Sequence, residues 1–138
     1  MILNYRQGTL KDLRNLKKLA LKSWAQFEPR LTRENWQKLH RTLQDEKTYG
    51  ELIEKSHSVL CVSENNIVGM AFLVPNGNPT DIYQEGWSYI RFVTVDPEYS
   101  GQGIAKKLTT MCIDTAKCNK EKVIALHTSE LMDAARHI

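Results

Sequence analysis

The chain has 138 residues, of which 41% are hydrophobic and 25% charged, and it carries a formal net charge of +3. These values are typical of a single globular domain, and the small positive charge allows an anionic ligand without requiring nucleic acid. No apolar run approaches the roughly 20 residues that cross a bilayer, and the first residues lack the apolar core of a signal peptide. We therefore expect a cytoplasmic protein with neither a membrane nor a nucleic-acid partner.

The first half of the chain is predicted to form one short strand and two main helices. Residues 2–6 favour a β-strand, and Thr9 and Asp12 then have the spacing of a capping box at a helix start. Pro29 ends this first helix, and Thr32 is a candidate cap for the second. The apolar faces are predicted to consist of Leu13, Leu16, Ala20, Trp24 and Phe27 in the first helix, and of Trp36, Leu39 and Leu43 in the second.

The second half is predicted to be rich in strands, because its hydrophobic period changes from helical to β-like. The segment "TYGELIE" is expected to add one more turn or two of helix before that change. Strands are predicted at 58–63, 67–74, 87–95 and 122–127, and helices from Ile104 and after a cap at Ser129. "ENN" favours a hairpin turn between the first two of these strands, and a helix joins the last two. The order β-α-α-β-β-β-α-β-α predicts an α+β fold with a mixed sheet.

The segment "VDPEYSGQGIAKKL", residues 95–108, carries the clearest functional signal, because small residues lead directly from a strand into a helix. The first amides of a helix have no intrahelical acceptor, and together with the helix dipole they attract an anion. Gly101, Gly103 and Ala105 remove side chains that would obstruct a phosphate, and glycine permits positive φ. Two lysines follow. The pattern predicts a pyrophosphate site, although it matches neither GxxxxGK[ST] nor GxGxxG.

This segment resembles motif A of the GNAT superfamily of acyl-CoA-dependent N-acetyltransferases, whose pattern is Arg/Gln-x-x-Gly-x-Gly/Ala. Gly103 and Ala105 match that pattern, whereas Ser100 stands where the family usually has Arg or Gln. "IALHTSELMDAARHI" is similar to the family's fifth strand and fourth helix. The resemblance implies a mixed, mostly antiparallel sheet flanked by helices and truncated after the fourth helix. Residues 1–138 would then form one GNAT-like acyl-CoA-binding domain that is C-terminally incomplete.

The resemblance also implies that acetyl-CoA is the co-substrate. Its extended pantetheine arm would pair with the backbone of the fourth strand, as an added strand does, where the family's fourth and fifth strands separate. Its pyrophosphate would lie on the amides of the glycine loop. The residues assigned to acetyl-CoA are Val93, Thr94, Val95, Gly101, Gln102, Gly103, Ile104, Ala105 and Lys106.

Acetyl transfer to an amine needs a base for the amine proton and a proton for the leaving thiolate. The candidate bases are His127, at the end of the fifth predicted strand, and Glu85, at the start of the fourth and acting through water. The ordinary pKa of histidine, about 6.5, suits this task. The alternative interpretations are a packed histidine at a strand end and a solvated loop carboxylate. The family's acid is often a Tyr in the fourth helix, and the sequence up to Ile138 has no counterpart of it.

The acceptor is predicted to be a small-molecule or peptide amine that is selected by the first two helices and the 75–86 loop. Trp24, Phe27, Glu28 and Arg30 cluster between those helices, and aromatic rings beside a carboxylate suit a cationic amine. A core role for the two aromatic residues fits the same pattern equally well.

The cysteines Cys61, Cys112 and Cys118 and the histidines have no ligand spacing, so neither a disulfide framework nor a metal site is predicted. Cys112 lies on an apolar helix face, which favours packing over a covalent acyl-enzyme. The competing interpretations are an acyl-CoA-binding or sensing module with weakened catalysis and a fragment of an active enzyme. A homodimer formed through an uncovered sheet edge is a further expectation.

Overall fold

The computed structural model describes residues 2–80 and 83–126. Its strands are β1 (Asn4–Arg6), β2 (His57–Ser63), β3 (Asn66–Val74), β4 (Ser88–Val95) and β5 (Ile124–Leu126). Its α-helices are α1 (Leu13–Trp24), α2 (Arg33–Gln44), α3 (Glu46–Lys55) and α4 (Ile104–Cys118), and its 3-10 helices are η1 (Leu10–Asp12), η2 (Ala25–Arg30) and η3 (Pro97–Tyr99). Within these described residues, no helix has the length and apolar character needed to cross a membrane.

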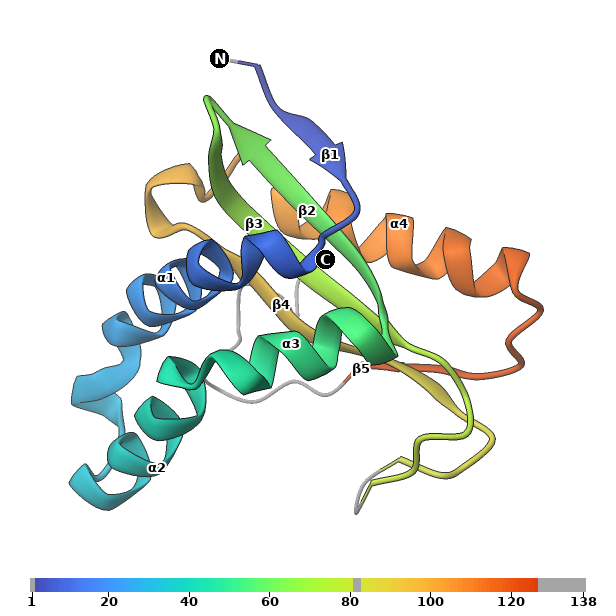
Figure 1. The fold of residues 1–138 in the computed structure, drawn as a ribbon, viewed down its shortest axis with the longest axis horizontal. Helices are drawn as coiled ribbons and strands as arrows, with labels where there is room; N and C mark the ends of the chain where they lie inside the picture. Colours follow the sequence, from blue (N-terminus) through green and yellow to red (C-terminus); the bar gives the residue numbers. More distant parts are fainter. Residues whose placement is uncertain (1, 81–82, 127–138) are drawn as a thin grey trace.

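The strands form one sheet in the order β1-β2-β3-β4-β5 (Figure 1). β1 to β4 are antiparallel neighbours, whereas β5 runs parallel to β4. The parallel pair is joined through α4, since a chain that re-enters a sheet in the same direction needs a crossover connection. The predicted α+β class, with a mixed and mostly antiparallel sheet between helices, is thereby confirmed.

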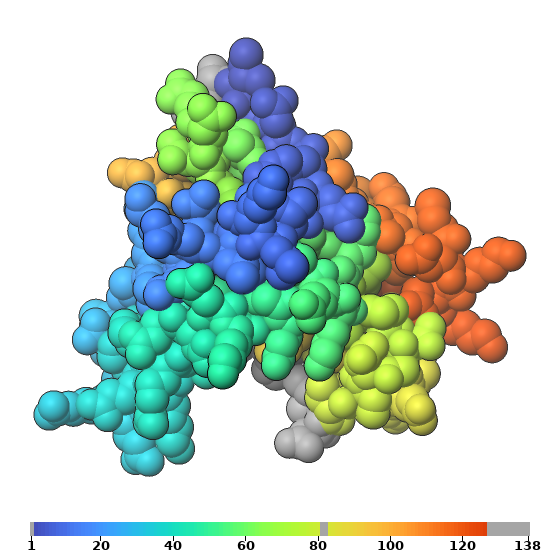
Figure 2. Space-filling view, viewed as in Figure 1, coloured from blue at the N-terminus to red at the C-terminus, as the bar shows by residue number. Residues whose placement is uncertain are grey.

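Helices cover both faces of this sheet, with α4 on one face and α1 to α3 on the other (Figure 1). Because successive strand side chains point to opposite faces, β2 gives Val59 and Cys61 to the α4 side and Leu60 to the α1–α3 side. Figure 2 shows the side chains of α1 and α3 spread across the second face, with α2 at one corner of the molecule. The sheet is therefore buried between two separate apolar cores.

The start of α4 is seated closely on β3 at Gly69. A Cβ atom at this position would lie 2.8 Å from Ile104 Cγ2 and 3.1 Å from Leu108 Cδ1, both closer than ordinary van der Waals contact. Ile104 is the first residue of α4 and is 1% exposed. The missing side chain of Gly69 thus determines where on the sheet this helix begins.

Most local predictions are confirmed, and the differences have physical reasons. The hairpin turn at Glu64 and Asn65 forms with φ values of 50° and 69°. α3 is a helix of 10 residues instead of the expected turn or two, because the Asp45 side chain caps it by accepting from the Lys47 amide. Phe27 lies in η2 and not in α1. The helix predicted after Ser129 lies outside the described residues.

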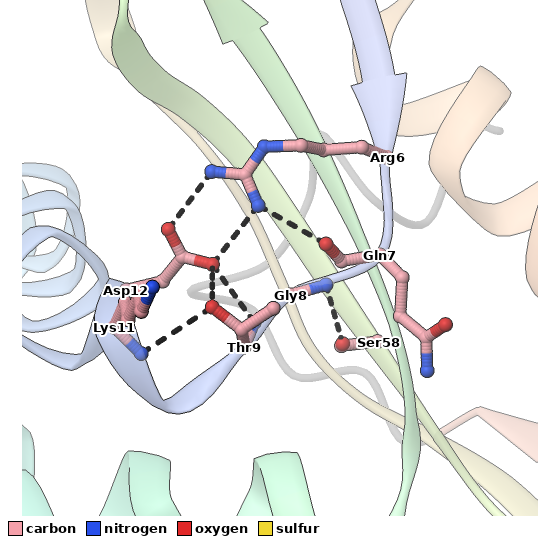
Figure 3. A network of polar contacts seen from close by, with 7 residues as sticks. All are labelled: Arg6, Gln7, Gly8, Thr9, Lys11, Asp12 and Ser58. Atoms are coloured by element: carbon pink, nitrogen blue, oxygen red, sulfur yellow. Dashed lines mark hydrogen bonds and ion pairs between the residues drawn. The ribbon is translucent and has the colours of Figure 1, made fainter.

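The predicted capping box is present at the start of the first helical segment (Figure 3). The Asp12 carboxylate accepts from the Thr9 amide at 2.8 Å, and the Thr9 hydroxyl accepts from the Lys11 amide at 3.3 Å. Arg6, at the end of β1, donates two hydrogen bonds to Asp12, at 2.9 and 2.8 Å, which holds the pKa of this carboxyl below its ordinary value. Gly8 donates to the buried Ser58 hydroxyl at 2.8 Å, so the entry into α1 is tied to both β1 and β2.

We predict that Asp12→Asn lowers the free energy of unfolding at pH 7 by about 1 kcal/mol, because the amide can still cap the helix but loses the charged partner of Arg6. A carboxyl whose folded-state pKa lies below the unfolded value stabilises the fold above that unfolded value, and this contribution is lost as pH falls through the folded pKa. The wild-type advantage should therefore vanish well below pH 3.8, the ordinary value for Asp. Urea unfolding at a series of pH values measures this.

The matched control is Asp114→Asn, which removes an exposed carboxylate of α4 that forms no ion pair or hydrogen bond with the described residues. It should change neither stability at pH 7 nor its acid dependence. Identical pH profiles for Asp12→Asn and wild type would contradict the role of the Arg6–Asp12 pair.

Candidate functional site

Both glycines of the loop between η3 and α4 have left-handed backbone conformations. Gly101 has φ = 81° and Gly103 has φ = 76°, and Gly103 is the N-terminal flanking residue of α4. A Cβ at either position would meet no atom of the described residues within 4 Å, so they leave the space around the loop open. The expectation that these glycines serve a tight turn is confirmed, because residues with a Cβ rarely adopt this conformation.

The loop leaves a run of backbone donors unused. The first helical hydrogen bond of α4 runs from the Lys107 amide to the Gly103 carbonyl, at 3.0 Å. Among the described residues, no backbone amide from 101 to 106 donates to a carbonyl or side chain. Gln102 and Lys106 are exposed, and Ala105 is half-buried. These amides lie at the positive end of the α4 dipole, which is an arrangement that attracts anions, and the pyrophosphate site at this loop stays a prediction.

The two lysines that follow differ in placement. Lys107 Nζ lies 5.9 Å from the centre of the Tyr5 ring, which directs this side chain toward β1. Lys106 is exposed and has no ion pair within the described part of the chain. Lys106 is therefore the lysine that remains available to an anion at the loop.

β4 contains a bulge at Phe92, which the sequence did not predict. Phe92 has φ = 55°, and the register against β3 shifts between Met70, which pairs with Thr94, and Phe72, which pairs with Arg91. One β3 residue, Ala71, thus faces two residues of β4. The bulge bends β4 at the level where its pairing with β5 ends, because a bulge disrupts the ladder and increases the local twist.

Among the described residues, no strand pairs with the edge of β4 beyond the bulge on the side of β5. Within the described residues, β5 pairs with β4 only from Ser88 to Ile90. The Asp96 amide donates to Val68 of β3 at 2.8 Å. Backbone groups of an antiparallel strand alternate in direction, so those of Val93 and Val95 face away from β3 and toward this open edge.

The predicted cofactor residues of β4 are not equivalent in this arrangement. The backbone of Thr94 faces β3, and its hydroxyl donates to the Phe92 carbonyl at 3.0 Å. The Val95 carbonyl accepts from the Ser23 hydroxyl of α1 at 3.1 Å, and its amide has no acceptor within the described residues. Val93 and Val95 are thus the positions of this trio whose backbone lies along the open edge.

Of the two candidate bases, the described residues include only Glu85. Glu85 is exposed and lies in the loop before Ser88, so the expected position at the start of β4 is wrong by a few residues, because a turn at Glu85 and Gly86 precedes the strand. His127 lies outside the described residues. Tyr89 does not offer a free hydroxyl, since it stacks on Tyr83 and donates to the Asn78 carbonyl at 3.0 Å.

The described cysteines and histidines give no sign of a covalent acyl-enzyme or of a metal site. Cys61 and Cys112 are buried, and burial raises the pKa of Cys112 to about 12 and also raises that of Cys61, so both are neutral thiols at pH 7. Cys118 is exposed. Among the residues that the structure describes, no group of three or more His, Cys, Asp or Glu side chains could hold a metal ion.

The cluster predicted for acceptor selection is partly a packing cluster. Trp24 and Phe27 form an edge-to-face pair with ring centres 5.5 Å apart, and Trp24 packs against the core under α1. Glu28 and Arg30 are exposed. The neighbouring helix α2 carries a shallow hollow of about 340 Å³. Among the described residues, it is lined by Trp36, Gln37, His40 and Arg41.

Sequence patterns missed two residues that hold the site together, Lys22 and Ser23. Both lie in the last turns of α1 and contact the end of β4 and η3, more than 70 positions later in the chain. Their positions in the helix mark them only as polar residues. The one local sequence signal in the segment that they contact is the Asp96-Pro97 pair. It indicates a capped turn, and in the structure it forms the start of η3.

Comparisons with known proteins place this geometry in a family. The family model described as the acetyltransferase (GNAT) family matches residues 16–138. No curated protein matches the chain.

Solved structures with the same fold include complexes with coenzyme A or acetyl-CoA. The PaiA N-acetyltransferase of Thermoplasma acidophilum, in complex with coenzyme A, has a TM-score of 0.78 at 15% identity, over 94% of this chain and 81% of that one. A predicted acetyltransferase of Clostridium acetobutylicum, with acetyl-CoA, has a TM-score of 0.71 at 20% identity, over 99% and 88%. The ribosomal-protein-alanine N-acetyltransferase of Brucella melitensis has a TM-score of 0.64 at 19% identity, over 99% and 86%.

We predict that Gly103→Ala lowers the free energy of unfolding by roughly 1–2 kcal/mol, because a Cβ is strained at φ = 76° even though the space around it is empty. The matched control is Gly86→Ala, at a glycine that also has no atom within 4 Å of an added Cβ but no left-handed φ. It should be neutral or slightly stabilising. Urea unfolding compares the two, and equal midpoints would contradict the assigned loop conformation.

Proposed function

Because the chain belongs to the GNAT family of acetyltransferases, we propose that it transfers an acetyl group from acetyl-CoA directly to an amine. The observation that carries the proposal is that two sets of backbone groups without a strand or helix partner among the described residues follow one another along the chain. The open edge of β4 at Val93 and Val95 leads through η3 to the amides of residues 101–106. In acetyl-CoA an extended pantetheine arm ends at a pyrophosphate, so its groups follow the same order as these two sets of backbone groups.

The pyrophosphate and the pantetheine arm of acetyl-CoA each have a proposed partner. The pyrophosphate accepts from the loop amides of residues 101–106, with Gly101 and Gly103 giving the space and the start of α4 giving the favourable dipole. The amide groups of the pantetheine arm pair with the backbone of Val93 and Val95, as a peptide pairs with a sheet edge. Coenzyme A and acetyl-CoA complexes of proteins with this fold support the assignment.

The proposed reaction takes place near the bulge of β4. A neutral amine attacks the thioester carbonyl carbon, the N–C bond forms, and the C–S bond breaks. A backbone N–H directed into the gap between β4 and β5 stabilises the charge that develops on the carbonyl oxygen. The amine proton passes to a base, and the sulfur leaves as a thiolate that takes up a proton.

We propose His127 as the base, because it follows directly after Leu126, the last residue of β5, whose partner Ile90 precedes the bulge. Glu85, acting through a water molecule, is the alternative base. The acceptor is proposed to be a small-molecule or peptide amine, which the side chains of α1, α2 and the 75–86 loop select.

A binding module that holds acyl-CoA without rapid turnover is the second candidate function. It is favoured by one observation, the engagement of Tyr89 with Tyr83 and the Asn78 carbonyl, which means that this hydroxyl near the start of β4 does not serve as a free acid or base. The two candidates share the cofactor site and differ only in turnover.

We predict that the chain binds coenzyme A and that Gly103→Val abolishes most of this binding, because the added side chain obstructs the amides and strains the loop. Lys106→Ala should weaken binding only about two- to fivefold at low salt, and less at high salt, because an exposed cation is screened whereas backbone amides are fixed. Titration calorimetry with coenzyme A measures both variants. Unchanged affinity in Gly103→Val would show that the pyrophosphate does not bind at this loop. Equal losses in both variants would contradict the prediction that the backbone amides contribute more to binding than Lys106 does.

We also predict that His127→Gln lowers the turnover of acetyl-CoA with an amine at least tenfold and leaves the affinity for coenzyme A within about twofold. The limb of the pH–rate profile below neutrality should disappear, because that limb reports protonation of the base. Release of free thiol against a panel of amines measures turnover. Wild-type turnover in His127→Gln would transfer the role to another group, with Glu85→Gln as the next variant.

A further inference from the structure

The last turns of α1 are attached to the segment that leads into the glycine loop. Lys22 Nζ lies 2.9 Å from Asp96 Oδ2 and 2.6 Å from Glu98 Oε2. The neighbouring Ser23, whose residue is 4% exposed, donates to the Val95 carbonyl. α1 therefore holds the end of β4 and the start of η3 through consecutive residues.

Asp96 is the structural centre of these contacts. Its side chain is 10% exposed, its Oδ1 accepts from the Glu98 amide at 2.9 Å, and its Oδ2 accepts from Lys22. Glu98, in contrast, has a side chain that is 73% exposed and makes no hydrogen bond other than that with Lys22 within the described residues. Asp96 is thus needed for the shape of the turn, whereas Glu98 contributes mainly its charge.

The placement of these carboxylates creates an electrostatic problem for an anion site. Glu98 and Gly101 are three residues apart, which limits their Cα separation to about 11 Å even in a fully extended chain. The turn is not extended, because the Tyr99 amide donates to the Asp96 carbonyl at 2.8 Å and the Ser100 amide to that of Pro97 at 3.3 Å. The backbone of Glu98 therefore lies within about one Debye length, at 0.1 M salt, of the first residue of the loop, and Asp96 precedes Glu98 by two residues.

We propose that Lys22 is a positioning residue for the acyl-CoA site, which neutralises the carboxylates of Asp96 and Glu98 and so permits a pyrophosphate to bind at the adjoining loop. The inference rests on the proposed function, since it takes the loop of residues 101–106 as the pyrophosphate site. Without Lys22, the carboxylates beside the loop repel the phosphates. The repulsion acts through solvent-exposed space, so salt must weaken it.

The test is titration calorimetry with coenzyme A at 50 and 500 mM NaCl. Lys22→Met should raise the Kd on the order of tenfold at low salt and only two- to threefold at high salt. Lys22→Arg should restore affinity to within about twofold of wild type, because it restores the charge. The double variant Lys22→Met/Glu98→Gln should recover part of the loss, because it removes the unpaired charge of Glu98 and leaves only that of Asp96.

Two further variants separate charge neutralisation from support of the fold. Lys18→Met, at an exposed lysine one turn earlier on α1, is the matched control and should bind like wild type at both salt concentrations. Glu98→Gln alone, which breaks no contact of Asp96, should bind coenzyme A about twofold more tightly at 50 mM NaCl and equally at 500 mM. This variant keeps the proposal testable if Lys22→Met does not fold.

The outcomes are distinct. A loss in Lys22→Met that is the same at both salt concentrations, and that Glu98→Gln does not relieve, would assign Lys22 to the fold alone and overturn the proposal. So would unchanged binding in Lys22→Met, or weaker binding in Glu98→Gln. Wild-type protein that fails to bind coenzyme A at either salt concentration would overturn the proposed function first and this inference with it.

Discussion

The unused backbone amides of residues 101–106 are the feature on which the rest of this structure depends for its function. The first amides of any helix lack an intrahelical acceptor, and here Gly101 and Gly103, both with positive φ, lead the chain into α4 so that the amides of residues 101–106 have no acceptor among the described residues. The remaining elements place this loop. β4 delivers the chain to it, and α4 continues from it with its buried first residue, Ile104, against Gly69 of β3.

α1 connects the two ends of the sheet that matter for the site. At its start, the Arg6–Asp12 pair and the Gly8–Ser58 hydrogen bond join it to β1 and β2 (Figure 3). At its end, Lys22 and Ser23 join it to the last residues of β4 and to η3. A helix of 12 residues spans about 18 Å, so α1 reaches from the first strands to the end of β4 and fixes the glycine loop relative to them.

Much of this arrangement could be predicted from the sequence, because it is local. The capping box at Thr9, the turn at Glu64 and Asn65, and the glycine loop each depend on residues within a few positions of one another. The sequence pattern predicts too short a helix at α3, since Thr48 and Gly50 are poor helix formers and the cap at Asp45 lies before the segment with the helical pattern.

The features that could not be predicted depend on contacts between distant residues. Phe92 adopts a positive φ inside a run of strand-forming residues, and nothing in that run distinguishes it from a regular strand. Lys22 meets Asp96 across 74 positions of sequence, and a lysine in an amphipathic helix is ordinarily a solvated residue. The bulge and the ion pairs are set by how α1, β3 and β4 pack together, so the open edge and the neutralised turn become visible only in three dimensions.

The central claim is that the loop amides and the open edge of β4 form one continuous site for acyl-CoA. The most direct measurement is a titration of ¹⁵N-labelled protein with coenzyme A, followed by the backbone amide resonances. The account predicts that the amides of residues 101–106, together with those of Val93 and Val95, show the largest changes and saturate with a single Kd, while those of α2 and α3 change little. Saturable binding that leaves the resonances of residues 101–106 unchanged would contradict it.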